Sequence, residues 1–234
     1  GPQSPAQPFQ KQAAQRQRKM TRHAGRLKKI ALTGGIGSGK SSLARVLSEF
    51  GYSVFDADKL VSEVVTEDDT RNAIVTLLGN DSYSQDSTGH LTYNRQFVRE
   101  RVFSEPQLRG ELEKILHPRL QNRFEVRCRE IEATSGAVWI FYEAALIFEQ
   151  ARESSFDAVV SVVASEDVRR RRLQSSRQLS DDLISAIFAA QVSDHVRRSK
   201  STFIFENEGR MDELPKFTLE LVSQLRQFFH PKSH

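Results

Sequence analysis

The chain has a single cysteine, Cys128, and no apolar run long enough to cross a lipid bilayer. One cysteine cannot form a disulfide within the chain, so disulfide-stapled scaffolds are excluded and a reducing, cytoplasmic compartment is expected. The N-terminal segment is polar and basic and lacks the apolar stretch that a secretory signal peptide requires. We therefore expect no membrane association.

Acidic side chains are absent from residues 1–29, which hold eight Lys or Arg. Subtracting those eight positive charges from the formal net charge of +4 leaves −4 for the remaining 205 residues. Residues 1–26 also have too few apolar side chains to fold alone, so we expect a disordered basic extension or an artificial leader. The alternative is that this segment is an arm that binds nucleic acid or a membrane surface. No other part of the chain suggests nucleic-acid binding, so nucleic acid is not expected as a partner.

Short apolar runs alternate with amphipathic segments along the rest of the chain. The runs predict strands at 30–33, 52–55, 138–142, 158–163 and, more weakly, 202–205. Helical spacing predicts helices at 41–50, from about 180, and at 214–229; residues 60–135 read as mainly helical around an exposed loop at 79–92. Strands that alternate with helices predict an α/β fold with a parallel sheet covered on both faces, and ligands bind at the carboxyl ends of such strands.

Glycines dominate the segment that follows the first strand. Residues 34–41 read GGIGSGKS, which fits the phosphate-loop pattern G-x-x-x-x-G-K-[ST] in its required place between a strand and a helix. Lys40 can reach the β and γ phosphates of a nucleoside triphosphate, and the Ser41 hydroxyl can ligate Mg²⁺. The candidate nucleotide-binding residues are Gly35, Ile36, Gly37, Ser38, Gly39, Lys40, Ser41 and Ser42. The pattern predicts a P-loop NTPase-type three-layer fold, but it does not separate kinases from GTPases or motor ATPases.

Carboxylates follow two of the predicted strands. Asp56 and Asp58 are two residues apart, so in an extended segment both can face the phosphate loop, where a carboxylate acts as a general base or binds Mg²⁺ through water. One of the two can instead cap the helix that follows. Glu143 ends another strand, as the acid of a Walker B segment does, and can help to place Mg²⁺; an ordinary strand-terminal acid is the alternative.

Four consecutive arginines, residues 169–172, come shortly after the predicted strand 158–163, and Arg177 follows five residues later. In small phosphotransferases such a segment forms a lid, here expected at about 167–195, whose arginines neutralise charge on the transferring group and exclude water. A solvated basic helix face is the alternative. His117 precedes Pro118, a pair that by itself indicates the start of a helix.

The chain from about residue 29 to 209 resembles the dephospho-CoA kinase family, whose members phosphorylate the ribose 3′-hydroxyl of dephospho-CoA. The resemblance rests on the string 32–41, the triplet 56–58, Val102–Phe103, the stretches 112–118 and 146–149, and Gln191. It implies ATP at the phosphate loop and a nucleotide-binding core made of 27–60 and 135–230. It also implies that the helical insertion, 61–134, holds the acceptor.

The resemblance also implies roles for single residues. Asp58 is the expected base for the 3′-hydroxyl, with Lys40 and Arg172 as further catalytic groups. Arg172, Arg95 and Arg177 are expected to contact phosphates, and Asn207 with Gly209 to lie beside adenine. Substrate contacts are expected from Asp56, Asp58, Arg95, His117 and Glu143, and the metal contact from Ser41. The expected state is a monomer or a weak homo-oligomer.

The chain departs from the family's usual pattern at three places, and the spacing around residues 89–95 is also longer by two residues. Residues 145–147 read Ala-Leu-Ile in place of Pro-Leu-Leu, Ser176 stands where an arginine is usual, and Thr202 or Phe203 stands in place of an aspartate. These changes concern the acceptor and lid regions and leave the donor half intact. The alternatives are another small-metabolite or nucleotide kinase of the same architecture and a catalytically silent nucleotide-binding module.

Overall fold

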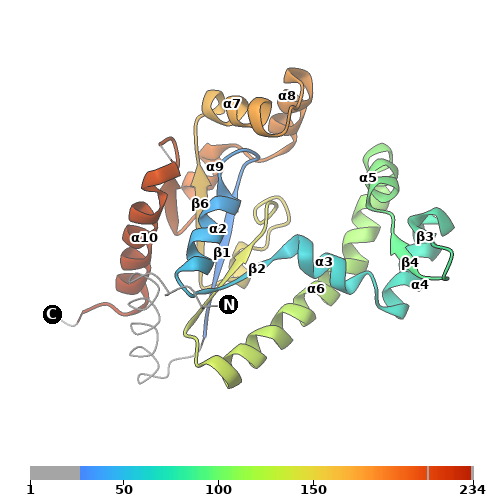
Figure 1. Cartoon of the computed structure of the whole chain (residues 1–234), viewed down its shortest axis with the longest axis horizontal. Coiled ribbons are helices and arrows are strands. Elements are labelled where there is room, and N and C mark those ends of the chain that lie inside the picture. Colours follow the sequence, from blue (N-terminus) through green and yellow to red (C-terminus); the bar gives the residue numbers. More distant parts are fainter. Residues whose placement is uncertain (1–26, 210, 233–234) are drawn as a thin grey trace, which may run out of the picture. The chain divides into compact units, whose positions relative to one another are not determined.

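A computed structural model describes residues 27–209 and 211–232, so the basic segment discussed above lies outside the described residues. The described chain forms two compact units (Figure 1). The sheet unit comprises the described residues up to Phe55 and from Ser135 onward, and the helical unit is Asp56–Thr134.

A five-stranded sheet in the order β2–β5–β1–β6–β7 forms the centre of the sheet unit. The strands are β1 (Lys28–Gly34), β2 (Ser53–Asp56), β5 (Trp139–Glu143), β6 (Ala158–Val163) and β7 (Phe203–Glu206). β1 pairs in parallel with β5 and β6, and β6 pairs in parallel with β7. These carboxyl ends therefore meet at one edge of the sheet, where a ligand site is expected.

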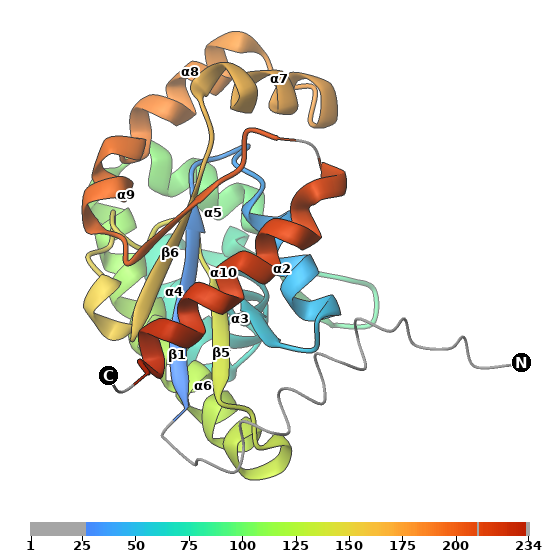
Figure 2. The same cartoon turned by 90° about the vertical axis from the view of Figure 1, so that its left-hand side faces the viewer.

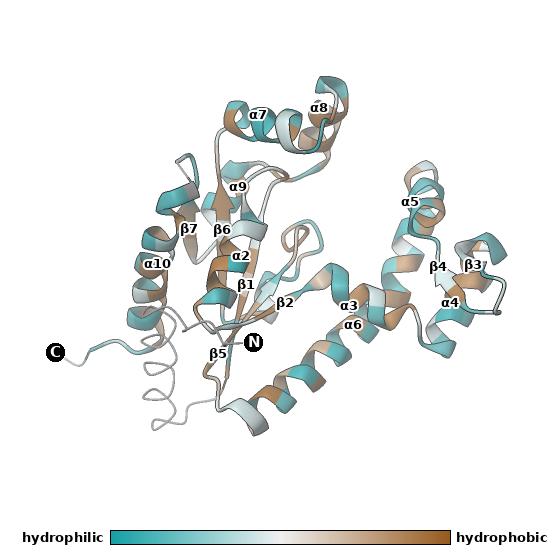
Figure 3. Cartoon of the chain, in the orientation of Figure 1, coloured by the Kyte–Doolittle hydropathy of each residue, from teal (hydrophilic) through white to brown (hydrophobic). Residues whose placement is uncertain are grey.

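Residue type explains why these segments are strands. β6 reads AVVSVV and all six of its residues are buried, as in a parallel strand covered on both faces. Figure 3 shows β6 and β7 largely in the hydrophobic colour. The aromatic side chains of β5 extend the core, because Tyr52 stacks on Trp139 with ring centroids 5.8 Å apart.

Among the described residues the sheet unit contains the helices α2 (Lys40–Glu49), α7 (Glu166–Ser176), α8 (Asp181–Ala190), α9 (Asp194–Lys200) and α10 (Leu214–Phe229), with one-turn 3-10 helices at Glu153–Ser155 and Met211–Glu213. α2 and α10 pack on the sheet through a shared apolar core that includes Leu43, Leu47, Leu221 and Leu225 (Figure 2). α7 and α8 lie beyond the carboxyl ends of β1 and β6 in both Figure 1 and Figure 2. The expected lid segment is therefore placed at the ligand-binding edge.

The helical unit contains α3 (Ala57–Val64), α4 (Asp68–Leu78), β3 (Tyr83–Gln85), β4 (Leu91–Tyr93), α5 (Arg95–Ser104) and most of α6 (Pro106–Ser135), with a 3-10 turn at Asn80–Ser82. Its own core contains Val65, Ile74, Leu78, Tyr83, Val98 and Leu112. Arg123 and Arg127 of α6 form ion pairs with Glu63 of α3, and Arg123 also pairs with Glu67. Apolar packing and these ion pairs together join α6 to α3.

Two local expectations were wrong in this unit. Residues 79–92 were expected to be an exposed loop, but they contain the antiparallel pair β3–β4, and Tyr83 is buried with its hydroxyl donating to the Val65 carbonyl at 2.7 Å. Pro118 does not start a helix, because it lies inside α6. In the next turn the Arg119 guanidinium donates to the Ile115 carbonyl at 2.7 Å.

None of the helices within residues 27–209 and 211–232 is both long and apolar enough to cross a membrane.

Candidate active site

The phosphate loop joins β1 to α2 and bends at two glycines. Gly37 and Gly39 have φ angles of +78° and +89°, which side-chain-bearing residues rarely adopt. At Gly39 an added Cβ would also overlap the side-chain amide nitrogen of Asn207. The N–H groups of Ser42 and Leu43 both donate to the Gly39 carbonyl at 3.1 Å, which begins α2. Glycine is therefore needed at position 39 for both its conformation and its small size.

Side chains from outside the loop bind its carbonyl groups. Arg172 Nη1 donates to the carbonyls of Gly37 and Ser38, both at 3.2 Å, and the amide of Asn207 donates to the same Ser38 carbonyl at 2.8 Å. Peptide bonds here are trans, so the N–H that shares a peptide with the Ser38 carbonyl, that of Gly39, points to the opposite side. Binding the carbonyl on one side thus leaves an N–H for an anion on the other.

Arg172 and Asn207 support each other as well as the loop. Arg172 Nη2 donates to the Asn207 carbonyl at 2.5 Å, and burial lowers the pKa of Arg172 while the Glu208 carboxylate opposes that change. The guanidinium stays charged, because arginine does not lose its proton in proteins. In the structure Arg172 and Asn207 bind the carbonyl groups of the phosphate loop. The contact of Arg172 with phosphate stays a prediction, and so do the contacts of Asn207 and Gly209 with adenine.

One carboxylate connects the first turn of α2 to the end of β5. Ser41 Oγ donates to Glu143 Oε1 at 2.8 Å, and Lys40 Nζ lies 3.9 Å from the same oxygen. The position of Glu143 follows from the sheet, since it is the register partner of Leu32 and the next residue, Ala144, donates its N–H to the Leu32 carbonyl at 3.0 Å. The sequence pattern of an acid at this strand end therefore indicated a residue that does contact the phosphate loop.

The Ser41–Glu143 pair places a hydroxyl and a carboxylate at the start of α2. Oxygen is the ligand atom that Mg²⁺ prefers, and protein sites for Mg²⁺ supply only one or two such ligands beside nucleotide phosphates and waters. The residues present therefore fit the ion that the sequence predicts at Ser41. No group of three or more His, Cys, Asp and Glu side chains that could hold a metal by themselves occurs among the described residues.

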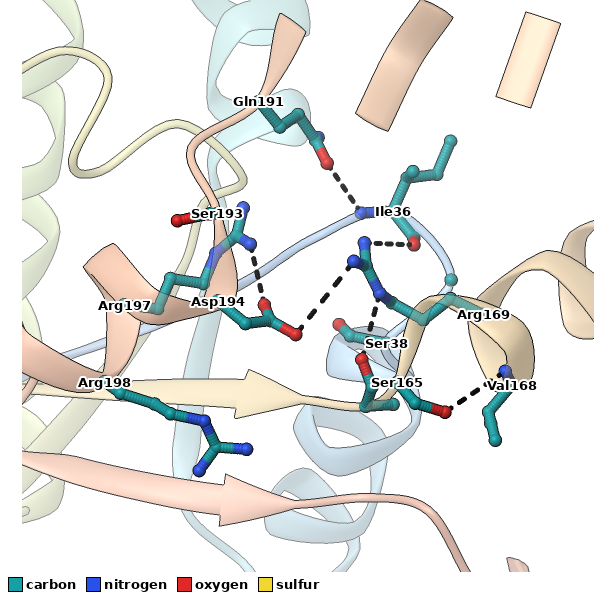
Figure 4. Close-up of polar contacts among 12 residues, drawn as sticks. Ile36, Ser38, Ser165, Val168, Arg169, Gln191, Ser193, Asp194, Arg197 and Arg198 are labelled. Atoms are coloured by element: carbon teal, nitrogen blue, oxygen red, sulfur yellow. Dashed lines mark hydrogen bonds and ion pairs between the residues drawn. The ribbon is translucent and has the colours of Figure 1, made fainter. Parts of the chain in front are cut away.

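The peptide groups of Ile36 are bound by two side chains from the lid region (Figure 4). Its N–H donates to Gln191 Oε1 at 2.9 Å, and its carbonyl accepts from Arg169 Nη1 at 3.5 Å. Arg169 is buried: its Nε donates to the Ala164 carbonyl at 3.1 Å and its guanidinium stacks on Phe188, 4.3 Å from the ring centroid. Gln191 was noted in the sequence without a role, and the structure makes it a contact to the loop.

The four consecutive arginines divide into two pairs. Arg169 and Arg172 point to the phosphate loop, whereas Arg170 pairs with Asp181 of α8 at 3.0 Å and Arg171 is exposed. The spacing of three residues places Arg169 and Arg172 on one face of α7. The expectation of a solvated basic face therefore describes only half of the segment.

Sequence reasoning missed α9 and the residues that it contributes to the site. Arg197 is 1% exposed and its Nη1 donates to Asp194 Oδ1 at 2.9 Å. Asp194 Oδ2 also lies 4.0 Å from Arg169 Nη2 (Figure 4). The local signals were Ser193, whose hydroxyl accepts from the Val196 N–H at 3.3 Å and caps the helix, and the placement of Asp194 in the first turn and of basic residues in the last.

Arg177, expected to contact phosphate, is exposed at the end of α7, and four further predicted site residues belong to the helical unit. Asp56 caps α3 by accepting the N–H of Asp58 at 2.8 Å, so the alternative role of a helix cap applies to Asp56. Ser62 Oγ donates to the Asp58 carbonyl at 3.1 Å and accepts from Arg95 Nη2 at 2.9 Å, which connects Asp58 and Arg95 through one serine. His117 is exposed on α6. Their approach to the phosphate loop stays a prediction.

The chain is similar in sequence and in fold to several known proteins. A family model described as dephospho-CoA kinase matches residues 28–213. The dephospho-CoA kinase of Chlorobium luteolum is 32% identical over 84% of this chain and 90% of its own length, and that of Salinibacter ruber is 33% identical over 82% and 94%. The crystal structure of TT1252 from Thermus thermophilus is similar over 86% of this chain and 99% of its own, with 26% identity and a TM-score of 0.72.

Proposed function

The chain belongs to the dephospho-CoA kinase family, and from this premise we propose that it phosphorylates the ribose 3′-hydroxyl of dephospho-CoA with ATP as donor. It is a kinase that uses a nucleotide and acts on a small molecule. One observation carries the substrate assignment: the match over residues 28–213 includes the phosphate loop and the whole helical unit. The matched region thus holds the whole of the expected acceptor half and the expected donor half up to residue 213.

The donor half of the reaction belongs to the sheet unit. Backbone N–H groups of the glycine-rich loop and the N-terminus of α2 attract the phosphates, and Lys40 supplies a positive charge that reaches the β and γ phosphates. Ser41 is proposed to ligate Mg²⁺, with Glu143 orienting the serine hydroxyl through the hydrogen bond at 2.8 Å. When bound, the ion neutralises charge that develops on the phosphoryl oxygens.

The acceptor half is assigned to the helical unit, with residues 61–134 holding dephospho-CoA. Asp58 accepts the proton of the 3′-hydroxyl as that oxygen attacks the γ phosphorus, and ADP departs with the electrons of the broken phosphorus–oxygen bond. Asp56, Arg95 and His117 are proposed to contact the acceptor. Arg172 lies over the loop and is proposed to stabilise charge on the transferring phosphoryl group.

The decisive experiment measures ADP release from MgATP with dephospho-CoA as acceptor, beside a control without acceptor, and identifies the product by mass spectrometry. We expect ADP release that depends on dephospho-CoA, together with formation of coenzyme A. Saturable ATP binding without acceptor-dependent release would contradict the substrate assignment and favour another acceptor or a silent binding module. The cytoplasmic location and the monomeric or weakly oligomeric state stay predictions.

A further inference from the structure

Two buried arginines lie against the first half of the phosphate loop. Arg169 is 5% exposed and Arg197 is 1% exposed. A Cβ added to Gly35 would lie 2.5 Å from Arg169 Nη1 and 3.2 Å from Arg197 Nη1. Both guanidinium groups therefore reach the backbone of Gly35 through the space that its missing side chain leaves.

The charges of this cluster do not balance. Asp194 lies 2.9 Å from Arg197 and 4.0 Å from Arg169, and no second carboxylate among the described residues lies within 4.0 Å of either guanidinium. Burial lowers the pKa of Arg169, the Asp194 charge opposes this, and the Arg197 charge adds to it. Both arginines stay protonated in spite of their burial. Glu166 also raises the pKa of Arg169, but its carboxylate forms no ion pair with either arginine, so two buried positive charges share one paired carboxylate.

The hydrogen bonds of the cluster do not balance either. Arg197 Nε and Nη2 are buried, and neither has an acceptor among the described residues. Leaving a buried charged donor without an acceptor is costly, so native structures rarely do so. The next residue shows the contrast, because Arg198 is half exposed and yet donates twice to Glu206, at 2.5 and 3.2 Å. The acceptors for these two donors therefore come from outside the described residues, from ordered water or from a bound ligand.

We propose that Arg197 is a further phosphate-binding residue of the nucleotide site, and that Asp194 positions it for the terminal phosphoryl group of the bound triphosphate. Such a group brings both features that the cluster lacks, a negative charge and several acceptor oxygens. We assign it to the terminal phosphate because that group carries the most charge and the most free oxygens of the triphosphate, so it can bind Lys40 at one end of the loop and Arg197 beside Gly35 at the other. This assignment rests on the proposed function, since it requires a triphosphate in the loop.

The test compares the affinities of a non-hydrolysable ATP analogue and of ADP, each with Mg²⁺, by calorimetric titration without acceptor. Arg197→Met removes the buried charge at similar length, and Arg198→Met removes the same charge from the neighbouring exposed position. For Arg197→Met we expect about 10- to 100-fold weaker binding of the analogue and almost unchanged binding of ADP, as for the loss of a charged hydrogen bond. Arg198→Met is expected to bind both nucleotides as the wild type does.

A second variant keeps the test decisive if Arg197→Met does not fold. Asp194→Asn retains the side-chain shape and both arginines, and we expect it to lower the ratio of analogue to ADP affinity by about 3- to 10-fold. Equal weakening of both nucleotides would mean that the cluster only supports the loop, and unchanged affinities would mean that it is not used; either result would overturn the assignment. The titrations contain no acceptor, so their outcome does not depend on dephospho-CoA being the substrate. The proposed function is tested separately, by the turnover of the wild-type protein with dephospho-CoA.

Discussion

The carboxylate of Glu143 lies 2.8 Å from the Ser41 hydroxyl, so the end of β5 is hydrogen-bonded to the residue expected to ligate Mg²⁺. Lys40 Nζ is 3.9 Å from the same carboxylate oxygen. One acidic side chain therefore sets the orientation of the serine and the position of the lysine. This arrangement predicts that replacing Glu143 changes the Mg²⁺ concentration that the enzyme requires and leaves its affinity for nucleotide unchanged.

Glu143→Gln should increase the Mg²⁺ concentration needed for half-maximal turnover by about 10- to 100-fold, because a residue that orients a metal ligand typically has that effect. The amide still accepts a hydrogen bond from Ser41, so ADP binding should persist. Glu206→Gln is the matched control, since Glu206 also ends a strand but pairs with the exposed Arg198. An unchanged Mg²⁺ requirement in Glu143→Gln would remove Glu143 from the site.

Lys40→Ala should lower the rate of acceptor-dependent ADP release by roughly 100-fold or more, as expected when a group that stabilises transferring charge is deleted. The charge that attracts the β and γ phosphates is lost, while the loop glycines remain. Lys114→Ala controls for the loss of a lysine, because Lys114 is exposed on α6 and pairs with Glu111. Near-normal turnover of Lys40→Ala would refute the assignment of the loop.

The fold could be read from the sequence wherever the local signal matched the tertiary environment. The buried strand 158–163 and the amphipathic helix 214–229 were predicted with the bounds that the structure shows. The short helix α9 was missed because its sequence, DHVRRSK, has no apolar periodicity and its buried face includes Arg197. The pair β3–β4 was missed because both strands are three residues long and mostly exposed.

Site residues could be predicted from the sequence only where they belong to a recognisable motif. The phosphate loop was found from its glycines, lysine and serine, and Glu143 from its place at a strand end. The Gln191 contact to Ile36 spans 155 residues of sequence, and the pairing of Arg169 with Asp194 depends on where α7 and α9 pack. Such long-range pairs leave no local pattern, so they were found only from the structure.

Gly39→Ala should abolish tight nucleotide binding and lower the free energy of unfolding by about 1–3 kcal/mol. The positive φ strains an alanine, and its methyl group would overlap the Asn207 amide. Gly89→Ala is the matched control, because Gly89 has a similar φ of +85° but its nearest neighbour, Gln85 Nε2, lies 3.5 Å from the added Cβ. For Gly89→Ala, chemical denaturation should show a lower free energy of unfolding from backbone strain, and nucleotide titration should show an unchanged affinity. Equal nucleotide affinities of both variants would contradict the contact with Asn207.

Tyr83→Phe should lower the free energy of unfolding by about 1–2 kcal/mol at neutral pH, because the Val65 carbonyl loses its donor. Burial raises the pKa of Tyr83 to about 12, above the ordinary value of 10.0. The wild-type stabilisation is therefore complete below pH 10 and is lost as the pH rises through about 12. Thermal melts across this alkaline range should show a smaller decline for Tyr83→Phe. Parallel curves for the two proteins would exclude Tyr83 as the titrating group.

Asp58→Asn should slow the chemical step by about 100-fold or more while nucleotide affinity and stability persist, because a general base is lost from an exposed position. Asp56 differs, since its side chain caps α3 at 2.8 Å from the Asp58 nitrogen. Asp56→Ala should therefore cost about 1 kcal/mol of stability and affect the chemical step less. Single-turnover kinetics and denaturation of both variants separate the two roles. A wild-type rate in Asp58→Asn with a slow step in Asp56→Ala would transfer the base to Asp56, and one carboxylate would then serve as both helix cap and base.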